Sequence, residues 1–145
     1  MSQIRVIAIA VIARPSDGAL LVYDARDANT GELYHRPLGG GIEFGETAEQ
    51  AVRRELREEI GVELEAVTLL GFLENLFTTD GRPGHQIVAV FSARLADPAL
   101  YARAEFAYVD YGIAWTAGWV PRAAFRSRHN PNGPPLYPAG LEALL

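Results

Sequence analysis

The stretch from Gly39 to Val62 is the feature that most constrains how this chain can fold, because a run of glycines is followed directly by the pattern of one long helix. It opens with three glycines, which let a backbone approach a ligand closely and leave carbonyl groups free to bind a metal. Thr47 with Gln50 predicts a capping box at the start of a helix, and Gly61 predicts its end. The apolar residues of this helix recur at helical spacing and should pack on a sheet: Ala48, Val52, Leu56 and Ile60.

Three carboxylates crowd the second half of the same helix. Glu55, Glu58 and Glu59 fall within roughly a quarter-turn of one helix face at about 100° per residue. Such neighbours repel one another unless a cation is present, and Mg²⁺ is the usual oxygen-bound cation where phosphates are also held. Taken alone, Glu- and Arg-rich helices are typical of solvated faces with pairs such as Arg54 and Glu58. The glycines, the helix and the spacing together favour a metal site.

The order of residues in this stretch resembles the Nudix box, the signature of the Nudix hydrolase family. The matching positions are Gly40, Glu46, Arg54, Glu55, Leu56, Glu58, Glu59, Gly61 and Val62, with the glycine pair Gly39 and Gly40 before the helix. One departure is visible: the family often has a proline directly before the glycine pair, whereas Leu38 stands between Pro37 and Gly39 here. The resemblance implies an α/β fold, with an α/β/α sandwich around a mixed β-sheet.

The resemblance also implies a metal-dependent pyrophosphohydrolase. Its substrate would be a nucleoside diphosphate linked to another group, such as a nucleoside triphosphate or a nucleotide sugar, and water would attack phosphorus. By the match to the box, Glu55, Glu58 and Glu59 are the catalytic residues. With a backbone carbonyl near Gly40 they are also the expected ligands of Mg²⁺, or of Mn²⁺ in its place.

Further residues near the box are candidates for substrate binding and support. Gly39, Gly40 and Gly41 should approach the substrate with Arg36, whose guanidinium suits a phosphate. An equally open interpretation of Arg36 is a salt bridge at the end of a strand. Glu46 should support the loop through Arg54, or else stand as an acid favoured by the helix dipole.

Outside the box the signals are weaker. Glu105 and Asp110 are candidates for an additional acid from a late strand, although surface acids are the commoner case. Three aromatic residues could stack on a base or belong to the core: Tyr34, Phe77 and Trp119. The three histidines have no metal-ligand spacing and receive no role.

Composition excludes several classes of protein. The 145 residues suit one domain over 1–145, and the net charge of −5 argues against general binding to nucleic acid or to a membrane surface. The chain has no cysteine, which excludes a disulfide and a thiolate nucleophile, and no lysine. Neither a signal peptide nor a membrane span is evident, so we expect a cytoplasmic protein.

The remaining chain predicts strands around the one long helix. They are expected at 6–13, 19–23, 33–36, 67–78, 86–95, 106–111 and 113–120, with loops at 24–32 and 126–138. Short helices are expected at 121–125 and at the end of 141–145. The buried run at 6–13 lacks alternation, which predicts a central strand covered on both faces.

Two other functions stay open beside the hydrolase. A non-catalytic Nudix-fold domain that senses nucleotides tends to lose box glutamates, and all are present here. A diphosphate isomerase of related fold relies on cysteine, which this chain lacks. The sequence does not choose the substrate, since a box specifies chemistry and not a base. A homodimer is expected, because the chain is apolar-rich and the family it resembles often dimerises.

Overall fold

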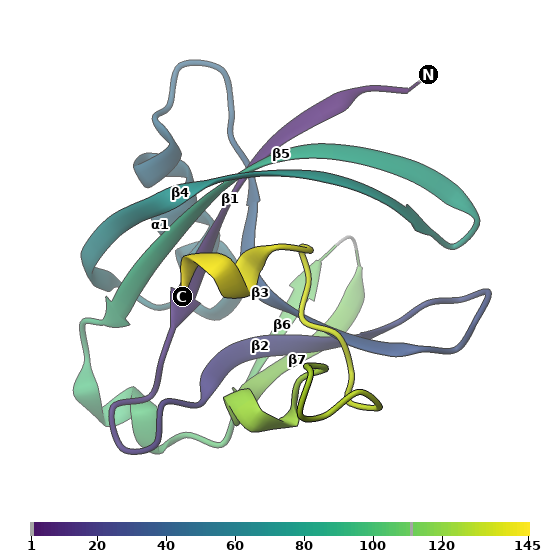
Figure 1. Ribbon diagram of the computed structural model, residues 1–145. Coiled ribbons are helices and arrows are strands. Elements are labelled where there is room, and N and C mark those ends of the chain that lie inside the picture. Colours follow the sequence, from purple (N-terminus) through teal and green to yellow (C-terminus); the bar gives the residue numbers. More distant parts are fainter. Residues whose placement is uncertain (1, 111) are drawn as a thin grey trace.

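The structure, a computed structural model, describes residues 2–110 and 112–145, without the side chain of Asp110. Within this part, seven strands form one sheet in the order β4-β5-β1-β3-β2-β7-β6 (Figure 1). The strands are β1 (Ile4–Ile12), β2 (Leu20–Arg26), β3 (Leu33–Gly41), β4 (Leu64–Thr79), β5 (Arg82–Leu95), β6 (Glu105–Asp110) and β7 (Ile113–Val120). The helices are α1 (Ala48–Ile60) and the 3₁₀ helices η1 (Pro98–Ala102), η2 (Arg122–Ala124) and η3 (Leu141–Leu144).

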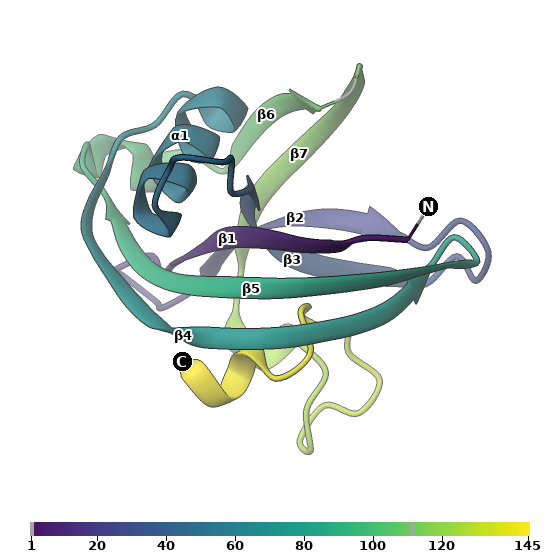
Figure 2. The ribbon, with the colours of Figure 1, turned by 90° about the horizontal axis from the view of Figure 1, so that it is seen from above.

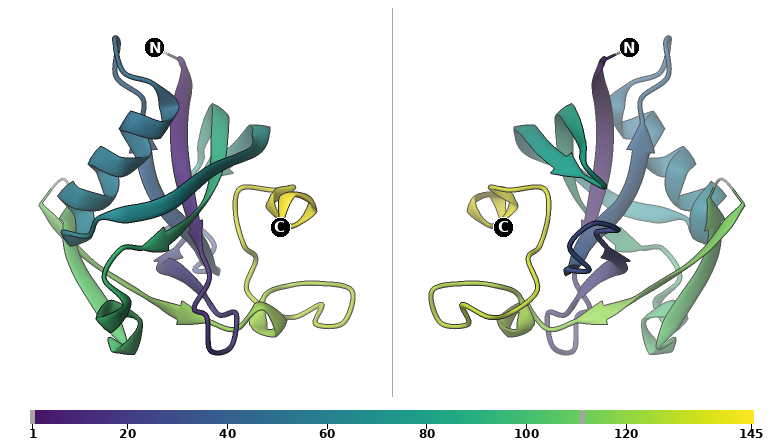
Figure 3. Two further views of the ribbon diagram at one scale, coloured as in Figure 1. Left: turned by 90° about the vertical axis from the view of Figure 1, so that its left-hand side faces the viewer. Right: turned by 90° about the vertical axis from the view of Figure 1, so that its right-hand side faces the viewer.

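The sheet is mixed, as the resemblance implied. β1 runs parallel to β5, and the other neighbouring strands pair antiparallel. In the view of Figure 2, α1 lies above β1, β5 and β4 on the page, and the C-terminal helix lies below them. The two side views show the same arrangement, with α1 and the C-terminal helix on opposite sides of the strands (Figure 3).

β1 is covered on both faces, which confirms the prediction for the apolar run near the N-terminus. Ala8 and Ala10 belong to the core cluster that includes α1, and their small side chains let the helix approach closely. Ile7 and Ile9 belong to a second cluster with Phe125 and other residues of the C-terminal part. Two hydrophobic cores therefore meet at this strand.

The three glycines are part of a strand, which differs from the expectation that they follow one. β3 continues to Gly41, and the glycines pair with 7–9 of β1. Gly39 has φ 153°, and a β-carbon there would lie 2.0 Å from the carbonyl oxygen of Ala8. Glycine therefore permits the contact between β3 and β1, and the pairing partner that extends the strand lies far away in sequence.

The α/β class is confirmed, and the two outer layers differ. α1 covers one face, whereas the C-terminal segment with the four-residue 3₁₀ helix η3 covers part of the other. β2 also extends to Arg26, three residues into the predicted loop, because Asp24, Ala25 and Arg26 pair with β3. Among the described residues, no helix is long and apolar enough to cross a membrane.

Candidate active site

The ends of α1 are fixed by local interactions. The Thr47 side chain accepts a hydrogen bond from the backbone N–H of Gln50, and the Gln50 side chain accepts one from Thr47. Gly61 ends the helix in the left-handed conformation at φ 69°. The helix therefore starts and stops as predicted, and its glutamates occupy fixed positions on a rigid element.

Glu55 lies directly against the backbone of β3. A β-carbon built on Gly40 would lie 2.5 Å from Cδ of Glu55, a distance that real side chains do not tolerate. The Glu55 side chain is only 16% exposed. The absence of a side chain at Gly40 thus creates the space that the Glu55 carboxylate occupies.

Arg54 joins the loop after β3 to the glutamates of the helix. Its Nη2 donates to Glu46 Oε1 at 2.6 Å and to the carbonyl oxygen of Gly41 at 2.9 Å, and its Nε donates to Glu46 Oε2 at 3.1 Å. Its Nη1 donates to Glu55 Oε1 at 3.0 Å and to Glu58 Oε2 at 3.2 Å. One guanidinium therefore fixes the glycine strand, the loop and the helix relative to one another.

Arg54 and Glu46 each stabilise the ionised form of the other. The hydrogen bond from Arg54 is the largest cause that lowers the pKa of Glu46, and the backbone N–H of Glu43 adds to it. The same hydrogen bond, followed by that to Glu55, raises the pKa of Arg54. Glu46 is therefore a carboxylate at neutral pH.

The three box glutamates differ in their surroundings. Glu58 is exposed, whereas Glu55 and Glu59 are half-buried at the seam between helix and sheet. Burial raises the pKa of the Tyr23 hydroxyl, Arg36 lowers it, and the negative charge of Glu59 adds to the rise. Glu59 is thus near enough to Tyr23 on β2 for its charge to affect the Tyr23 hydroxyl.

The donor atoms fit a hard divalent cation in kind, since they are carboxylate oxygens on adjacent positions of one helix. Among the described side chains, however, no three acidic, histidine or cysteine groups already form a metal-binding cluster. Glu55 and Glu58 are turned toward Arg54 instead. The metal-ligand roles of Glu55, Glu58 and Glu59 remain predictions.

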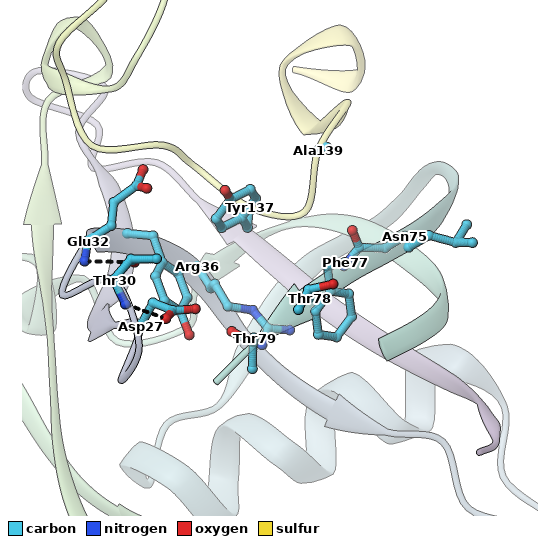
Figure 4. A pocket seen from close by; sticks show the side chains of 12 residues that line it. Asp27, Thr30, Glu32, Arg36, Asn75, Phe77, Thr78, Thr79, Tyr137 and Ala139 are labelled. Atoms are coloured by element: carbon cyan, nitrogen blue, oxygen red, sulfur yellow. Dashed lines mark hydrogen bonds between the residues drawn. The ribbon is translucent and has the colours of Figure 1, made fainter. Parts of the chain in front are cut away.

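A cavity of about 340 Å³ lies between β3 and the end of β4. Figure 4 shows side chains from both strands and from the C-terminal segment around it. Its aromatic lining consists of Tyr34, Phe77 and Tyr137, and the rings of Tyr34 and Tyr137 meet edge to face at 5.4 Å. These rings supply flat surfaces of the kind that binds a heterocyclic ring, while most of the other lining side chains are polar or charged, among them Asp27 and Glu32.

Arg36 connects this cavity to the box helix. It lines the cavity, and its Cζ lies 6.0 Å from the centre of the Tyr23 ring. Within the described residues Arg36 forms no ion pair, so the alternative of a salt bridge at the strand end is not realised. The guanidinium is available to an anion that extends from the cavity toward Tyr23 and Glu59.

Segments far apart in the sequence close the cavity. The backbone N–H of Ala28 donates to Asp80 Oδ1 at 2.7 Å, which joins the β2–β3 turn to the β4–β5 turn. The C-terminal segment attaches to His35 of β3, whose N–H donates to Pro135 and whose carbonyl oxygen accepts from Tyr137. This attachment places Tyr137 beside Tyr34.

The remaining candidates lie elsewhere. Glu105 is exposed at the start of β6, opposite Gly118 of β7, and among the described residues no hydrogen bond joins it to the box. Asp110 ends β6, but its side chain lies outside the described residues. Trp119 packs against Phe106 in the core and donates a hydrogen bond to the carbonyl oxygen of Arg103, so it belongs to the core.

The histidines take no part in the site as described. His35 is buried, and its Nδ1 lies 2.9 Å from Asp24 Oδ1 without hydrogen-bond geometry. Sequence reasoning singled out three of the twelve residues that line the cavity, and Asn75 and Tyr137 are among those that it missed. Neither carries a local pattern that could have revealed it, because the cavity forms only when three distant segments meet.

The sequence is similar to those of two known bacterial proteins. The chain is 33% identical over 114 residues to MutT4 of Mycobacterium tuberculosis (strain CDC 1551 / Oshkosh), which covers 79% of this chain and 43% of that protein. It is 39% identical over 71 residues to the 8-oxo-dGTP diphosphatase of Escherichia coli (strain K12), covering 49% of this chain and 54% of that protein. The chain thus matches about half the length of these curated relatives.

A solved structure matches almost the whole chain. The MutT NUDIX hydrolase from Burkholderia pseudomallei superposes with a TM-score of 0.67 at 28% identity, over 99% of this chain and 97% of that one. The sequence profile of the NUDIX domain matches residues 3–139. This chain belongs to the NUDIX family.

Proposed function

We propose that this protein is a metal-dependent hydrolase that cleaves a pyrophosphate bond in a nucleoside diphosphate linked to another group. The observation that carries the proposal is the placement of Glu55 against Gly40, with every fixed position of the box present. A carboxylate that touches the glycine strand on one side and shares Arg54 with Glu58 on the other is held where a phosphate could meet it.

Each box residue has a proposed part in this reaction. Glu55, Glu58 and Glu59, with the carbonyl of Gly40, would hold Mg²⁺, and Mn²⁺ could replace it. When bound, the cation would neutralise phosphate charge and acidify a water. Arg54 keeps Glu46 and the glycine strand in register with the helix. The half-buried Glu59 is the best placed to orient the attacking water, since it borders the sheet.

The proposed position of the substrate is based on the cavity between β3 and β4. A nucleobase would enter between Tyr34, Phe77 and Tyr137, and the phosphates would run past Arg36 toward α1 along Gly39, Gly40 and Gly41. Among the possible groups we favour a nucleoside triphosphate, since one relative is named an 8-oxo-dGTP diphosphatase. The non-catalytic sensor is less well supported, because all the box glutamates are present.

A substrate panel tests this function. Purified protein with Mg²⁺ would be incubated with nucleoside triphosphates, oxidised nucleoside triphosphates, nucleotide sugars, dinucleoside polyphosphates and ADP-ribose. The phosphate-containing products would be identified by mass. We expect a nucleoside monophosphate product from at least one class. Binding of nucleotides without any product, with either Mg²⁺ or Mn²⁺, would favour the sensor instead.

Three broader expectations also remain proposals. The family match over 3–139 supports one NUDIX domain across residues 1–145. Cytoplasmic location rests on the sequence alone. A homodimer is supported by exposed apolar side chains on β1 and β4, and sedimentation showing only monomer would contradict it; these side chains are Ile4, Val6, Phe72 and Leu76.

A further inference from the structure

Two buried amide side chains, those of Asn75 and Gln86, face each other, and Asn75 lines the cavity. Asn75 of β4 and Gln86 of β5 are directly opposite in the strand register, and each is only 7% exposed. The Nδ2 of Asn75 donates to Oε1 of Gln86 at 3.3 Å. Among the described residues the only other buried polar side chain is His35. An apolar pair would fill this position in a sheet without the cost of burying amides.

The amide of Asn75 has unused hydrogen-bonding capacity. An asparagine offers two N–H donors and a carbonyl oxygen, and its single hydrogen bond in the described chain uses one donor. Within the described residues, His35 Nδ1 alone is both fully enclosed and without a hydrogen bond. The Oδ1 of Asn75 is therefore not fully enclosed, and Asn75 lines the cavity (Figure 4).

The surroundings of this amide suit the edge of a flat ring. The rings of Tyr34, Phe77 and Tyr137 line the same cavity and supply apolar faces. An asparagine amide presents a donor beside an acceptor, which matches the amino group and N7 of adenine. The corresponding edge of guanine presents two acceptors, which leaves the carbonyl oxygen of the amide without a donor.

We infer that Asn75, oriented by Gln86, is a specificity-determining residue that hydrogen-bonds the edge of the bound base and favours adenine over guanine. The inference rests on the proposed function insofar as the cavity must hold the nucleoside part of the substrate. Asn75 acts on the base by direct contact. Gln86 is a positioning residue, because its carbonyl oxygen holds the Asn75 amide in one orientation.

Equilibrium binding tests the inference separately from hydrolysis. Calorimetric titration of the full chain with AMP and with GMP gives the ratio of their affinities, and no turnover is needed. Wild-type protein should bind AMP more tightly. Asn75→Leu and Asn75→Asp should each weaken AMP binding by roughly ten- to a hundredfold while GMP binding changes little, since one paired base edge has about that value.

Companion variants separate recognition from folding. Asn75→Leu combined with Gln86→Leu removes both polar partners, so it should melt near the wild-type temperature and still lack the preference for AMP. Gln86→Leu alone should reduce the preference only in part. Glu74→Gln is the matched control, because Glu74 is the exposed neighbour of Asn75 on β4 and does not line the cavity.

The possible results are distinct. Equal affinity for AMP and GMP in the wild type, or an affinity ratio that Asn75→Asp and Asn75→Leu leave unchanged, would overturn the inference while hydrolysis could stand. Selective AMP binding without hydrolysis of any substrate would support the inference and contradict the proposed function. Failure of both nucleotides to bind would overturn the inference and remove the support that the cavity gives to the function.

Discussion

The carboxylate of Glu55 occupies the space that a side chain on Gly40 would need. A β-carbon on Gly40 would lie 2.5 Å from Cδ and 2.6 Å from Oε1 of Glu55. The position of the Glu55 side chain on the helix therefore depends on a glycine at position 40 of the neighbouring strand.

Replacing Gly40 by alanine should displace Glu55 and lower turnover. The β-carbon would first meet the flexible carboxylate end of Glu55, so thermal melting should change little, and steady-state kinetics would measure the loss of activity that follows when this carboxylate moves. Gly118→Ala on β7 is the matched control, because Gly118 lies outside the box and a β-carbon there would approach only the carbonyl oxygen of Ala104, at 3.3 Å. A Gly40→Ala protein with normal turnover would show that the position of Glu55 is unimportant.

Neutral glutamine substitutions should rank the box glutamates. Glu55→Gln and Glu59→Gln, the two half-buried positions, should each lower turnover by roughly a hundredfold or more, the scale of losing a positioned acid–base or electrostatic group. Glu58→Gln should retain more activity, because Glu58 is exposed. Glu49→Gln should equal wild type, since Glu49 pairs only with Arg53 on the exposed side.

Thermal melting of the same glutamine variants should show that all four proteins fold. Arg54 offsets the repulsion between Glu55 and Glu58, so their neutralisation should change stability little. If Glu55→Gln and Glu59→Gln both kept wild-type turnover, the hydrolase interpretation of the box would be wrong.

Removal of divalent metal should stop hydrolysis and leave the fold intact. Arg54 pairs with Glu46, Glu55 and Glu58 and so balances part of the carboxylate charge within the protein, and we therefore expect the fold to persist when the cation is removed. Activity in excess chelator, restored by Mg²⁺ or Mn²⁺, and circular dichroism of the same samples would measure both effects. Full activity in the presence of chelator contradicts the metal role.

Stability at acidic pH should depend on Glu46. Its pKa is lower in the folded protein than its ordinary value of 4.5, chiefly through Arg54. A depressed folded-state pKa stabilises the protein above the unfolded pKa, and this contribution disappears as pH falls through the folded value. Glu46→Gln should therefore flatten the fall of melting temperature below about pH 4.5. An unchanged pH profile would show that the pair contributes nothing.

The aromatic wall of the cavity should affect binding more than chemistry. Tyr137→Ala removes the ring that meets Tyr34 but leaves the backbone hydrogen bond to His35 in place. We expect KM for a nucleotide substrate to rise several-fold, with kcat little changed, because a stacked base contributes about 1–3 kcal/mol. Phe44→Ala is the control, because Phe44 is a fully exposed aromatic residue that does not line the cavity.

The sequence predicted the parts of the fold that depend on neighbours along the chain. The capping box of Thr47 and Gln50 and the terminal Gly61 are local patterns, and both are confirmed. The contact of Arg54 with Glu46 is also within the box and lies where the sequence suggested. The burial of the run that contains Ile7 and Ala8 followed from its lack of alternation.

The features that sequence reasoning missed depend on distant partners. The glycines of β3 became strand residues because β1 pairs with them, and no local pattern records that pairing. Asn75 and Tyr137 are 62 positions apart and meet around one cavity only after the C-terminal segment attaches to His35. The 3₁₀ helix η1 after Asp97 was likewise not predicted.

β3 carries Tyr34 and Arg36 at one end and the glycine that touches Glu55 at the other. Gly40 is four positions after Arg36, so an extended backbone sets these two residues at most about 14 Å apart. The extended backbone of β3 therefore sets the distance between Arg36 and Gly40. If the proposed substrate places its base beside Tyr34 and its cleaved bond beside Gly40, this span limits the number of phosphates that can lie between the two.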